Sequence, residues 1–325
     1  MEPTTTPNDR PAVREPKASG PEAPDGFRPS VTICVCTFRR PEMLKKLLGM
    51  LRSQVTGGRF DFSVIVVDND KDGSGADAVR DVRPGSPFPI QYFVEPERSI
   101  SVARNRAVRE AQGDLIAFID DDEFPDDHWL ERLVETLALS CSEGVLGPIR
   151  PHYDNVPPAW LVKSGILERK SYRTGETIGN PNDTRTGNAL VVRRLFDGED
   201  GSFDLRYGKT GGGDVDFFNR MMLKGNRFVF CDEAVVYETV PLERQKRSYY
   251  TKRAFTRGMT TAMYVPFLSR GTLKSLAAIL IYTAALPVAF LLGQHQFMKY
   301  LIKDCDHLGK VLKYMGIEIV KFRPY

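Results

Sequence analysis

The stretch GDLIAFIDDDEFPDDHWL, Gly113 to Leu130, decides the fold. An apolar run ends at three aspartates and a glutamate, Asp120 to Glu123. Bunched carboxylates repel one another, so something must compensate their charge. A hard divalent cation, Mg²⁺ or Mn²⁺, is the natural partner, because carboxylate oxygens suit these ions. The alternative from these residues alone is a solvated acidic turn before a helix that begins near Asp126 or Asp127.

The chain around this stretch alternates short apolar runs with helical patterns. Apolar runs at 31–37, 62–68, 90–95 and 114–120 predict strands, and periodic segments at 41–54 and 101–113 predict helices. Strands this apolar are typical of a parallel sheet that helices cover on both faces. We therefore expect a doubly wound α/β unit from residue 31 to about 150.

Composition limits the function classes. The chain has 325 residues, of which 42% are hydrophobic and 27% charged, and its net charge of +3 gives no case for nucleic-acid binding. Its five cysteines show no CxxC spacing, which favours free thiols in a reducing compartment over a zinc site or disulfides. Residues 1–29 are rich in Pro and charge and predict a disordered tail without a secretion signal.

Asp68 ends a second apolar strand, so it should meet Asp120 at the carboxyl edge of the sheet, where ligands gather in open α/β folds. The run DNDKDG (68–73) also imitates half of a calcium-binding EF-hand loop. Val79 stands where such a loop needs a glutamate, which disfavours that interpretation. An aspartyl-phosphate phosphatase is disfavoured too, because Asp72 replaces the expected hydroxyl residue.

Four segments in order carry a family resemblance: VTICVCTFRRPEMLKKLL, VIVVDND, SVARNRAVREAQGDLIAFIDDDE and TGGGDVDFFNRM. Together they resemble an inverting glycosyltransferase of family 2 with the GT-A fold, a Rossmann-like, mostly parallel sheet flanked by helices. The match is nearest to bacterial exopolysaccharide transferases of the succinoglycan type and covers roughly residues 30 to 260. The resemblance implies a catalytic domain over 30–243 and a nucleotide-sugar donor, with UDP as the expected nucleotide.

The resemblance also assigns residues. The implied donor-binding set is Thr37, Phe38, Arg39, Asp68, Arg104, Asp120 and Asp121. Asp120 and Asp122 match the DxD motif and would hold Mg²⁺ or Mn²⁺ together with Glu238, which stands where many relatives have a histidine. Gly213 replaces the glutamate that usually precedes the catalytic aspartate.

Inversion needs a base on the face opposite the leaving group, and Asp214 is the predicted base, with Asp216 as its competitor. Asp214 could instead only N-cap the following helix. Asp216, Trp160, Gly187 and Asn188 are the predicted acceptor-binding residues. A core tryptophan and a tight turn before a strand explain the last three without function.

The C-terminal part, 244–325, combines basic residues with an uncharged run, Ser275 to Gln294, about as long as a bilayer crossing. Arg244, Arg247 and Arg253 are predicted to contact a diphosphate or an anionic membrane. The apolar run could cross a bilayer, lie at its interface, or form a buried helical hairpin.

These expectations combine into one hypothesis. The protein is expected to transfer a sugar from a nucleotide donor to a polyprenyl-diphosphate-linked saccharide, with membrane lipids as further partners, at the cytoplasmic face of the bacterial inner membrane. A nucleotidyltransferase is disfavoured because TFRRPEM has no glycine for a phosphate loop. A non-catalytic membrane-bound scaffold of the same fold also stays open.

Overall fold

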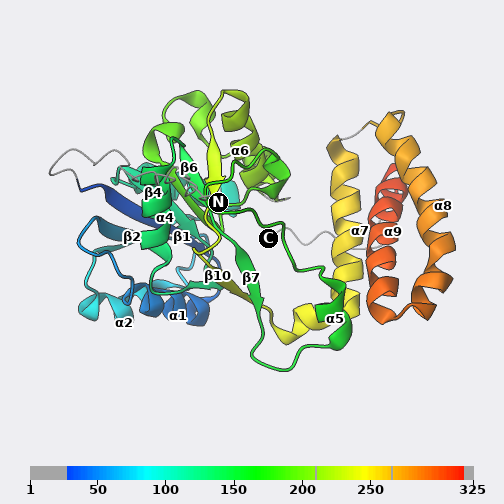
Figure 1. Ribbon diagram of the computed structural model, residues 1–325, viewed down its shortest axis with the longest axis horizontal. Coiled ribbons are helices and arrows are strands. Elements are labelled where there is room, and N and C mark those ends of the chain that lie inside the picture. The colour runs from blue at the N-terminus through cyan, green and yellow to red at the C-terminus, as the bar shows by residue number, and fades with distance from the viewer. Residues whose placement is uncertain (1–27, 209–210, 265, 318–325) are drawn as a thin grey trace, which may run out of the picture.

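A computed structural model describes residues 28–208, 211–264 and 266–317 of the chain. Two parts are visible in Figure 1: an α/β domain and a group of three long helices beside it. Most of the predicted N-terminal tail lies outside the described residues.

The larger sheet has seven strands in the order β3-β2-β1-β4-β8-β6-β9. The first four are parallel to one another, as predicted. β8 is antiparallel to both of its neighbours, while β6 and β9 are parallel. The strands are β1 Ser30–Thr37, β2 Asp61–Asp68, β3 Ile90–Val94, β4 Leu115–Ile119, β6 Gly144–Leu146, β8 Asn188–Val192 and β9 Phe228–Phe230. The prediction of a mostly parallel sheet is confirmed, and the sheet extends well past residue 150.

Helices cover both faces of this sheet. One face packs against α1 (Pro41–Leu51), α2 (Ala76–Val82) and α4 (Trp129–Leu139). The other packs against α3 (Ile100–Glu110) and α6 (Gly213–Leu223). A short helix, α5 (Ala159–Ser164), lies outside this sandwich.

The sequence explains why α1 forms where it does. Pro41 lies in its first turn, where a missing N–H does no harm, and Leu44, Leu47, Leu48 and Leu51 form one buried stripe. The start of α3 is fixed by Ser99, whose hydroxyl accepts a hydrogen bond from the Val102 N–H.

A second sheet, of three strands, begins directly after Asp120–Asp122 in the chain. It contains β5 (Glu123–Pro125), β10 (Val236–Thr239) and β7 (Ile149–His152) in that order. In this sheet Glu238 pairs directly with Glu123. Residues more than 100 positions apart in the chain therefore meet beside Asp120–Asp122.

The C-terminal helices are α7 (Arg247–Tyr264), α8 (Arg270–Leu291) and α9 (Gln294–Tyr314). α9 packs against both of the others, whereas α7 and α8 hardly touch. α7 faces the α/β domain and α8 lies farthest from it (Figure 1). A short 3₁₀ turn, Leu242–Gln245, links β10 to α7.

Candidate active site

The candidate site lies at the carboxyl edge of the larger sheet, as expected of an open α/β fold. Thr37 ends β1 and Asp68 ends β2, and the two residues are neighbours in the ladder. β4 pairs with the other side of β1 and leads directly into Asp120. Three strand ends therefore converge here, as predicted.

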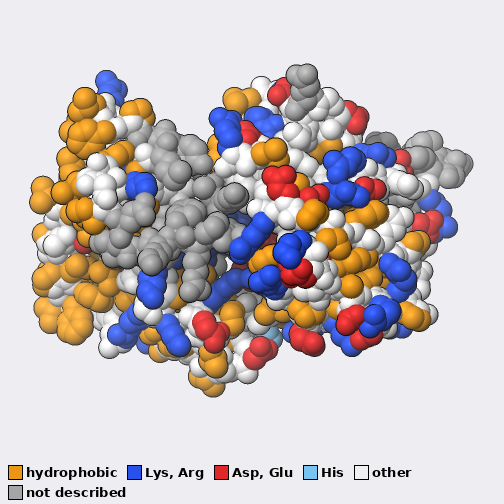
Figure 2. Space-filling view, turned by 180° about the vertical axis from the view of Figure 1, so that it is seen from behind, with side chains coloured by type: hydrophobic (Ala, Val, Ile, Leu, Met, Phe, Trp, Pro, Cys, Tyr) orange, Lys and Arg blue, Asp and Glu red, His pale blue; other side chains and the backbone are white. Residues whose placement is uncertain are grey.

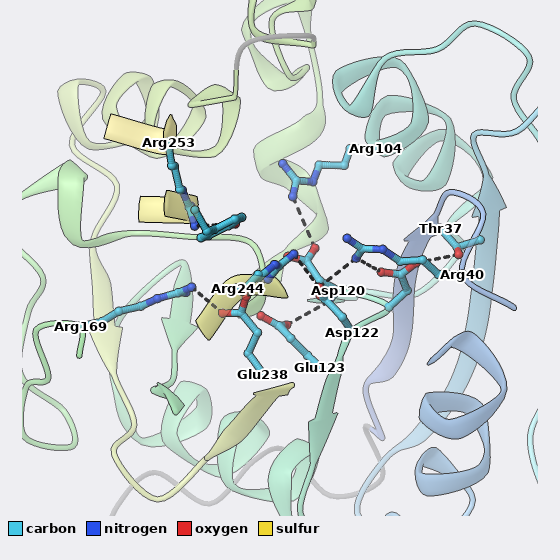
Figure 3. A network of polar contacts seen from close by, with 12 residues as sticks. Thr37, Arg40, Arg104, Asp120, Asp122, Glu123, Arg169, Glu238, Arg244 and Arg253 are labelled. Carbon is cyan, nitrogen blue, oxygen red and sulfur yellow. Dashed lines mark hydrogen bonds and ion pairs between the residues drawn. The ribbon is translucent and has the colours of Figure 1, made fainter. Parts of the chain in front are cut away.

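Arginine side chains compensate the charge of the acidic cluster, Asp120–Asp122 (Figure 3). Arg40 Nη1 lies 3.0 Å from Asp121 Oδ1 and 2.9 Å from Asp122 Oδ2. Arg104 Nη2 lies 3.5 Å from Asp120 Oδ1. Arg244 Nη2 lies 3.4 Å from Asp122 Oδ2. Each aspartate thus has a guanidinium partner within the protein.

The middle aspartate of the cluster points into the fold. Asp121 is buried and accepts a 2.7 Å hydrogen bond from the Thr37 hydroxyl. Burial raises the pKa of Asp121, against the opposing effect of Arg40. Asp121 therefore connects the loop after β4 to the end of β1. Of the three aspartates, Asp120 and Asp122 are the two available to a ligand.

Asp120 and Glu123 are electrostatically strained. Burial raises the pKa of Asp120 to about 6, although Arg104 opposes the shift and the nearby carboxylates reinforce it. Glu123 is buried, whereas Asp120 is partly exposed, and Glu123 Oε2 accepts a 3.0 Å hydrogen bond from the Asp120 N–H. Burial raises the pKa of the Glu123 carboxyl well above its usual range. Added positive charge would relieve this concentration of carboxylates.

Asp68 is fully buried and organises the loop that follows β2. Its carboxylate accepts hydrogen bonds from the Gly75 N–H at 2.6 Å, the Asp70 N–H at 2.9 Å and the Tyr92 hydroxyl at 2.8 Å. These three donors fix the loop at the sheet edge. The predicted contact between Asp68 and a nucleotide would have to use its remaining acceptor capacity.

Phe38 and Arg39 lie on the rim of this loop. Arg39 is the one non-glycine residue with positive φ (55°) among those the structure describes, and its Nε donates to Asp70 Oδ2 at 3.0 Å. Two guanidinium groups lie over the Phe38 ring. The Arg39 guanidinium carbon is 5.2 Å from the ring centroid, and that of Arg98 is 4.6 Å from it. An aromatic ring flanked by cations suits a planar base or an anionic group.

Asp214 lies in the first turn of α6, near enough to Asp120 and Arg104 for its charge to act on both. Its carboxylate is near enough to contribute to the raised pKa of Asp120, of which burial is the main cause. The N-cap of α6 is Gly212 with φ 93°, so the alternative that Asp214 serves only as N-cap is wrong.

Asp216 lies on the same helix but turns away. It pairs with Arg220 at 2.9 Å, and Arg220 also donates to the Ser202 carbonyl at 2.7 Å. Asp216 is therefore held in a local ion pair. The geometry favours Asp214 over Asp216 as the residue that faces the crevice.

Glu238 completes the candidate metal site. Its Oε1 accepts from Arg244 Nη1 at 2.8 Å and its Oε2 from Arg169 Nη2 at 2.9 Å. Arg244 thus bridges Glu238 and Asp122, so two carboxylates already converge on one cation (Figure 3).

The described residues contain no cluster of three or more His, Cys, Asp or Glu side chains with metal-binding geometry. Mg²⁺ needs only one or two protein carboxylates when a diphosphate supplies further oxygens, so Asp122 and Glu238 fit such an ion.

The predicted acceptor residues are spread more widely. Gly187 lies at the site, where an added Cβ would be 2.5 Å from Glu123 Oε1. Asn188 is buried and acts inside the fold: its amide donates to the carbonyls of Pro148 and Ala234, and its oxygen accepts from Trp129 Nε1 at 2.8 Å. Both donors of Asn188 are used by the protein itself.

Trp160 lies on α5, beside α7. Its ring meets Tyr250 edge-on at 5.8 Å, and the Arg247 guanidinium lies 5.7 Å from its centroid. Arg247 therefore belongs to the junction between the domain and the C-terminal helices. Arg253, by contrast, is exposed on α7, and its Nη1 donates to the hydroxyl of Tyr249 on the same helix at 3.5 Å.

Sequence reasoning missed Arg40, Arg169 and Arg185. Arg185 is half-buried and lies close enough to Asp214 and Glu238 to feel their charge, although burial dominates its lowered pKa. Arg40 could have been found from its place directly after β1, at the predicted ligand edge. The sequence around Arg169 and Arg185 does not distinguish these two residues from surface arginines.

The model of the family "Glycosyl transferase family 2" matches residues 32–198. A curated relative, the succinoglycan biosynthesis protein ExoM of Rhizobium meliloti, is 38% identical over 237 residues, which are 71% of this chain and 73% of that protein. The chain belongs to glycosyltransferase family 2. The resemblance predicted from its motifs is confirmed.

Two further proteins are similar to this chain. Glucosyl-dolichyl phosphate glucuronosyltransferase of Haloferax volcanii is 25% identical over 233 residues, 69% of this chain and 67% of that protein. Among solved structures, mannosyltransferase PcManGT from Pyrobaculum calidifontis, in complex with GDP-Man and Mn²⁺, matches with a TM-score of 0.57 and 21% identity, covering 91% of this chain and 90% of that one. The structural match establishes the GT-A fold of this family 2 chain.

Proposed function

We propose that this family 2 enzyme transfers a sugar, with inversion at the anomeric carbon, from a nucleoside-diphosphate sugar to a saccharide carried on a lipid diphosphate. The relative ExoM supports a role in exopolysaccharide or other cell-surface glycan synthesis. The dolichyl-phosphate relative supports a lipid-linked acceptor. The donor nucleotide is proposed to be UDP, with GDP as the comparison because the solved neighbour holds GDP-Man.

The observation that best supports this proposal is the proximity of Asp214, in the first turn of α6, to Asp120 and Arg104. Burial is the main cause of the raised pKa of Asp120, and Asp214 contributes to it, so the two carboxylates lie near each other. A donor diphosphate beside Asp122 would leave Asp214 on the far face of the sugar. That is the face from which an acceptor hydroxyl must attack for inversion.

The chain's own residues would then divide the work. Asp214 takes the proton of the acceptor hydroxyl as its oxygen bonds to the anomeric carbon, and the bond from that carbon to the diphosphate oxygen breaks. Arg244, which contacts Asp122 and Glu238, would bind the departing diphosphate, and Arg253 on α7 would add a second positive charge. Asp122, Asp120 and Glu238 would hold a Mg²⁺ or Mn²⁺ ion, which when bound supplies Lewis-acid stabilisation of the leaving group.

Calorimetric titration with UDP and with GDP, each with and without Mn²⁺, tests the donor site. Wild type should bind one of them in a metal-dependent manner, and Asp122→Asn should lose the metal dependence. Failure of both nucleotides to bind would contradict the proposal and favour a non-catalytic scaffold.

Asp214→Asn tests the base, with Asp216→Asn, two residues further along the same helix, as its matched control. The first should keep nucleotide binding and lose sugar transfer, measured on membrane extracts that supply the lipid-linked acceptor with radiolabelled donor sugar. Equal loss in both variants would refute the assignment of Asp214.

A further inference from the structure

We infer that α7, α8 and α9 form a membrane-binding module that lies flat on an anionic bilayer, with the outer face of α8 in the interface and without any crossing. The inference deepens the proposed function by naming a lipid surface as a partner. Its tests measure binding and topology, so they can fail independently of catalysis.

The outer face of α8 is apolar and open. By length and composition α8 is long and apolar enough to cross a membrane, and only 11% of its apolar stretch is buried inside the protein. The exposed side chains include Leu273, Leu276, Leu280, Ile281, Val288 and Leu291. They belong to the end of the molecule that is largely hydrophobic in Figure 2. Soluble surfaces rarely leave so long an apolar face uncovered.

Charge points to lipid as the occupant of this face. Residues 247–314 contain ten Lys and Arg against two Asp, a net charge of +8, whereas the whole chain carries +3. Arg270 and Lys274 are exposed in the first turns of α8, beside the apolar face. Anionic leaflets attract such basic residues, whereas two copies of this module would repel each other.

The packing of α9 argues against a crossing. Ring contacts run along the whole antiparallel pair: Phe290 with Phe297 at 5.7 Å, Tyr282 with His307 at 5.9 Å, and Phe267 with Tyr314 at 5.3 Å. A crossing α8 would therefore draw α9 into the hydrocarbon. The charged residues of α9 are Lys299, Lys303, Asp304, Asp306, Lys310 and Lys313. Charged side chains at bilayer depth are strongly unfavourable.

Polar and close backbone contacts oppose separation of α8 from its partners. Thr283 donates to Asp304 Oδ2 at 3.1 Å, and Ser275 Oγ lies 3.3 Å from His307 Nδ1. α9 is fixed to α7 in turn, because a Cβ at Gly258 would be 1.9 Å from the Asp306 carbonyl oxygen. We therefore expect the three helices to bind the bilayer as one unit, with α8 on the lipid side.

Flotation of the full-length protein with vesicles of phosphatidylcholine, with and without phosphatidylglycerol, tests the surface. The double variant Leu280→Gln/Leu291→Gln should lower the partition coefficient by about tenfold or more per leucine. The control, Leu139→Gln/Leu223→Gln, replaces two equally exposed leucines of the α/β domain and should bind normally. Equal binding of both double variants, or no preference for phosphatidylglycerol, would overturn the proposal.

Protease protection tests the topology. An epitope at each end of the chain should stay accessible when the protein is added to preformed sealed vesicles. Because α9 runs antiparallel to α8, a third epitope is placed in the turn between them, after Leu292, and it should stay accessible as well. Protection of this epitope or of the C-terminal one would mean that α8 crosses, and would overturn the inference. Sedimentation in the absence of lipid completes the test. If the wild type forms a stable oligomer, the Leu280→Gln/Leu291→Gln variant is monomeric and neither binds vesicles, the apolar face binds a second copy of the chain instead, and the proposal is wrong.

Discussion

Asn188 provides the sharpest test of how the site is supported. Its side chain connects three segments: it accepts from Trp129 Nε1 on α4 and donates to the carbonyls of Pro148 and Ala234. In Asn188→Ala the Pro148 carbonyl keeps a partner, because it also accepts from the Val236 N–H at 3.0 Å. The indole Nε1–H of Trp129 and the Ala234 carbonyl lose the bonds that Asn188 supplies.

The expected loss of stability follows from those two groups. Each buried polar group left unsatisfied costs about 1–3 kcal/mol, so the two together cost about 2–6 kcal/mol, and the cavity left by the smaller side chain adds to this loss. Such a loss is a large share of the roughly 5–15 kcal/mol that stabilises a typical domain. Urea unfolding followed both by circular dichroism and by tryptophan fluorescence measures it, and agreement of the two probes checks two-state behaviour.

Two comparisons sharpen the result. Asn188→Asp removes both donors and places a carboxylate opposite two carbonyls, so burial should raise its pKa in the folded state. Its penalty should be small at low pH, where the group is protonated in both states, and grow as pH rises through the unfolded pKa of about 3.9. Combining Asn188→Ala with Trp129→Phe should cost less than the two single changes together, because both remove the same hydrogen bond.

The alternative role of Asn188 predicts a different pattern. If its side chain bound the acceptor, Asn188→Ala would weaken acceptor use and leave the urea midpoint almost unchanged. A stability loss below about 1 kcal/mol, a net value typical of a single hydrogen bond, would therefore refute the structural reasoning.

Three other predictions concern the site and the thiols. Gly187→Ala should lower the thermal unfolding midpoint and nucleotide binding, because its Cβ would be 2.5 Å from Glu123 Oε1, whereas Gly179→Ala has nothing within 4 Å and should be silent. Arg244→Gln removes the guanidinium between Asp122 and Glu238, so it should strengthen Mn²⁺ binding in the absence of nucleotide. The same change should weaken UDP binding by about tenfold or more, because a contact to the diphosphate is lost. Calorimetry measures both affinities, and an unchanged Mn²⁺ affinity would contradict this reasoning. Of the five free cysteines, Cys141 alone is exposed, so a thiol reagent should label one site rapidly and Cys141→Ser should lose that phase.

The parallel half of the fold was predictable because its signals are local. The four strands from β1 to β4 are apolar runs, and α1 has a proline start and a leucine stripe. Chain order then places Thr37, Asp68 and Asp120 at one edge. β8 was not predictable in this way, because its place between β4 and β6 depends on long-range pairing rather than on its five residues.

The compensation of the acidic cluster was foreseen only in part. Its residues predict a cation, and the structure supplies guanidinium groups from Arg40, Arg104 and Arg244. These arginines lie on a loop, a helix and a 3₁₀ turn up to 204 positions apart in the chain. Only the folded chain brings them together, and a surface arginine has the same local sequence as one that faces a carboxylate.

The arginine partners of the acidic cluster also bear on how a ligand would enter. Because Arg40 and Arg244 already hold Asp122, the carboxylate is ordered during folding. An incoming metal–diphosphate would exchange one set of ionic contacts for another rather than immobilise a free loop. The conformational entropy of these side chains is thus lost on folding, before the donor binds. The free energy of donor binding is therefore not reduced by the cost of ordering the site.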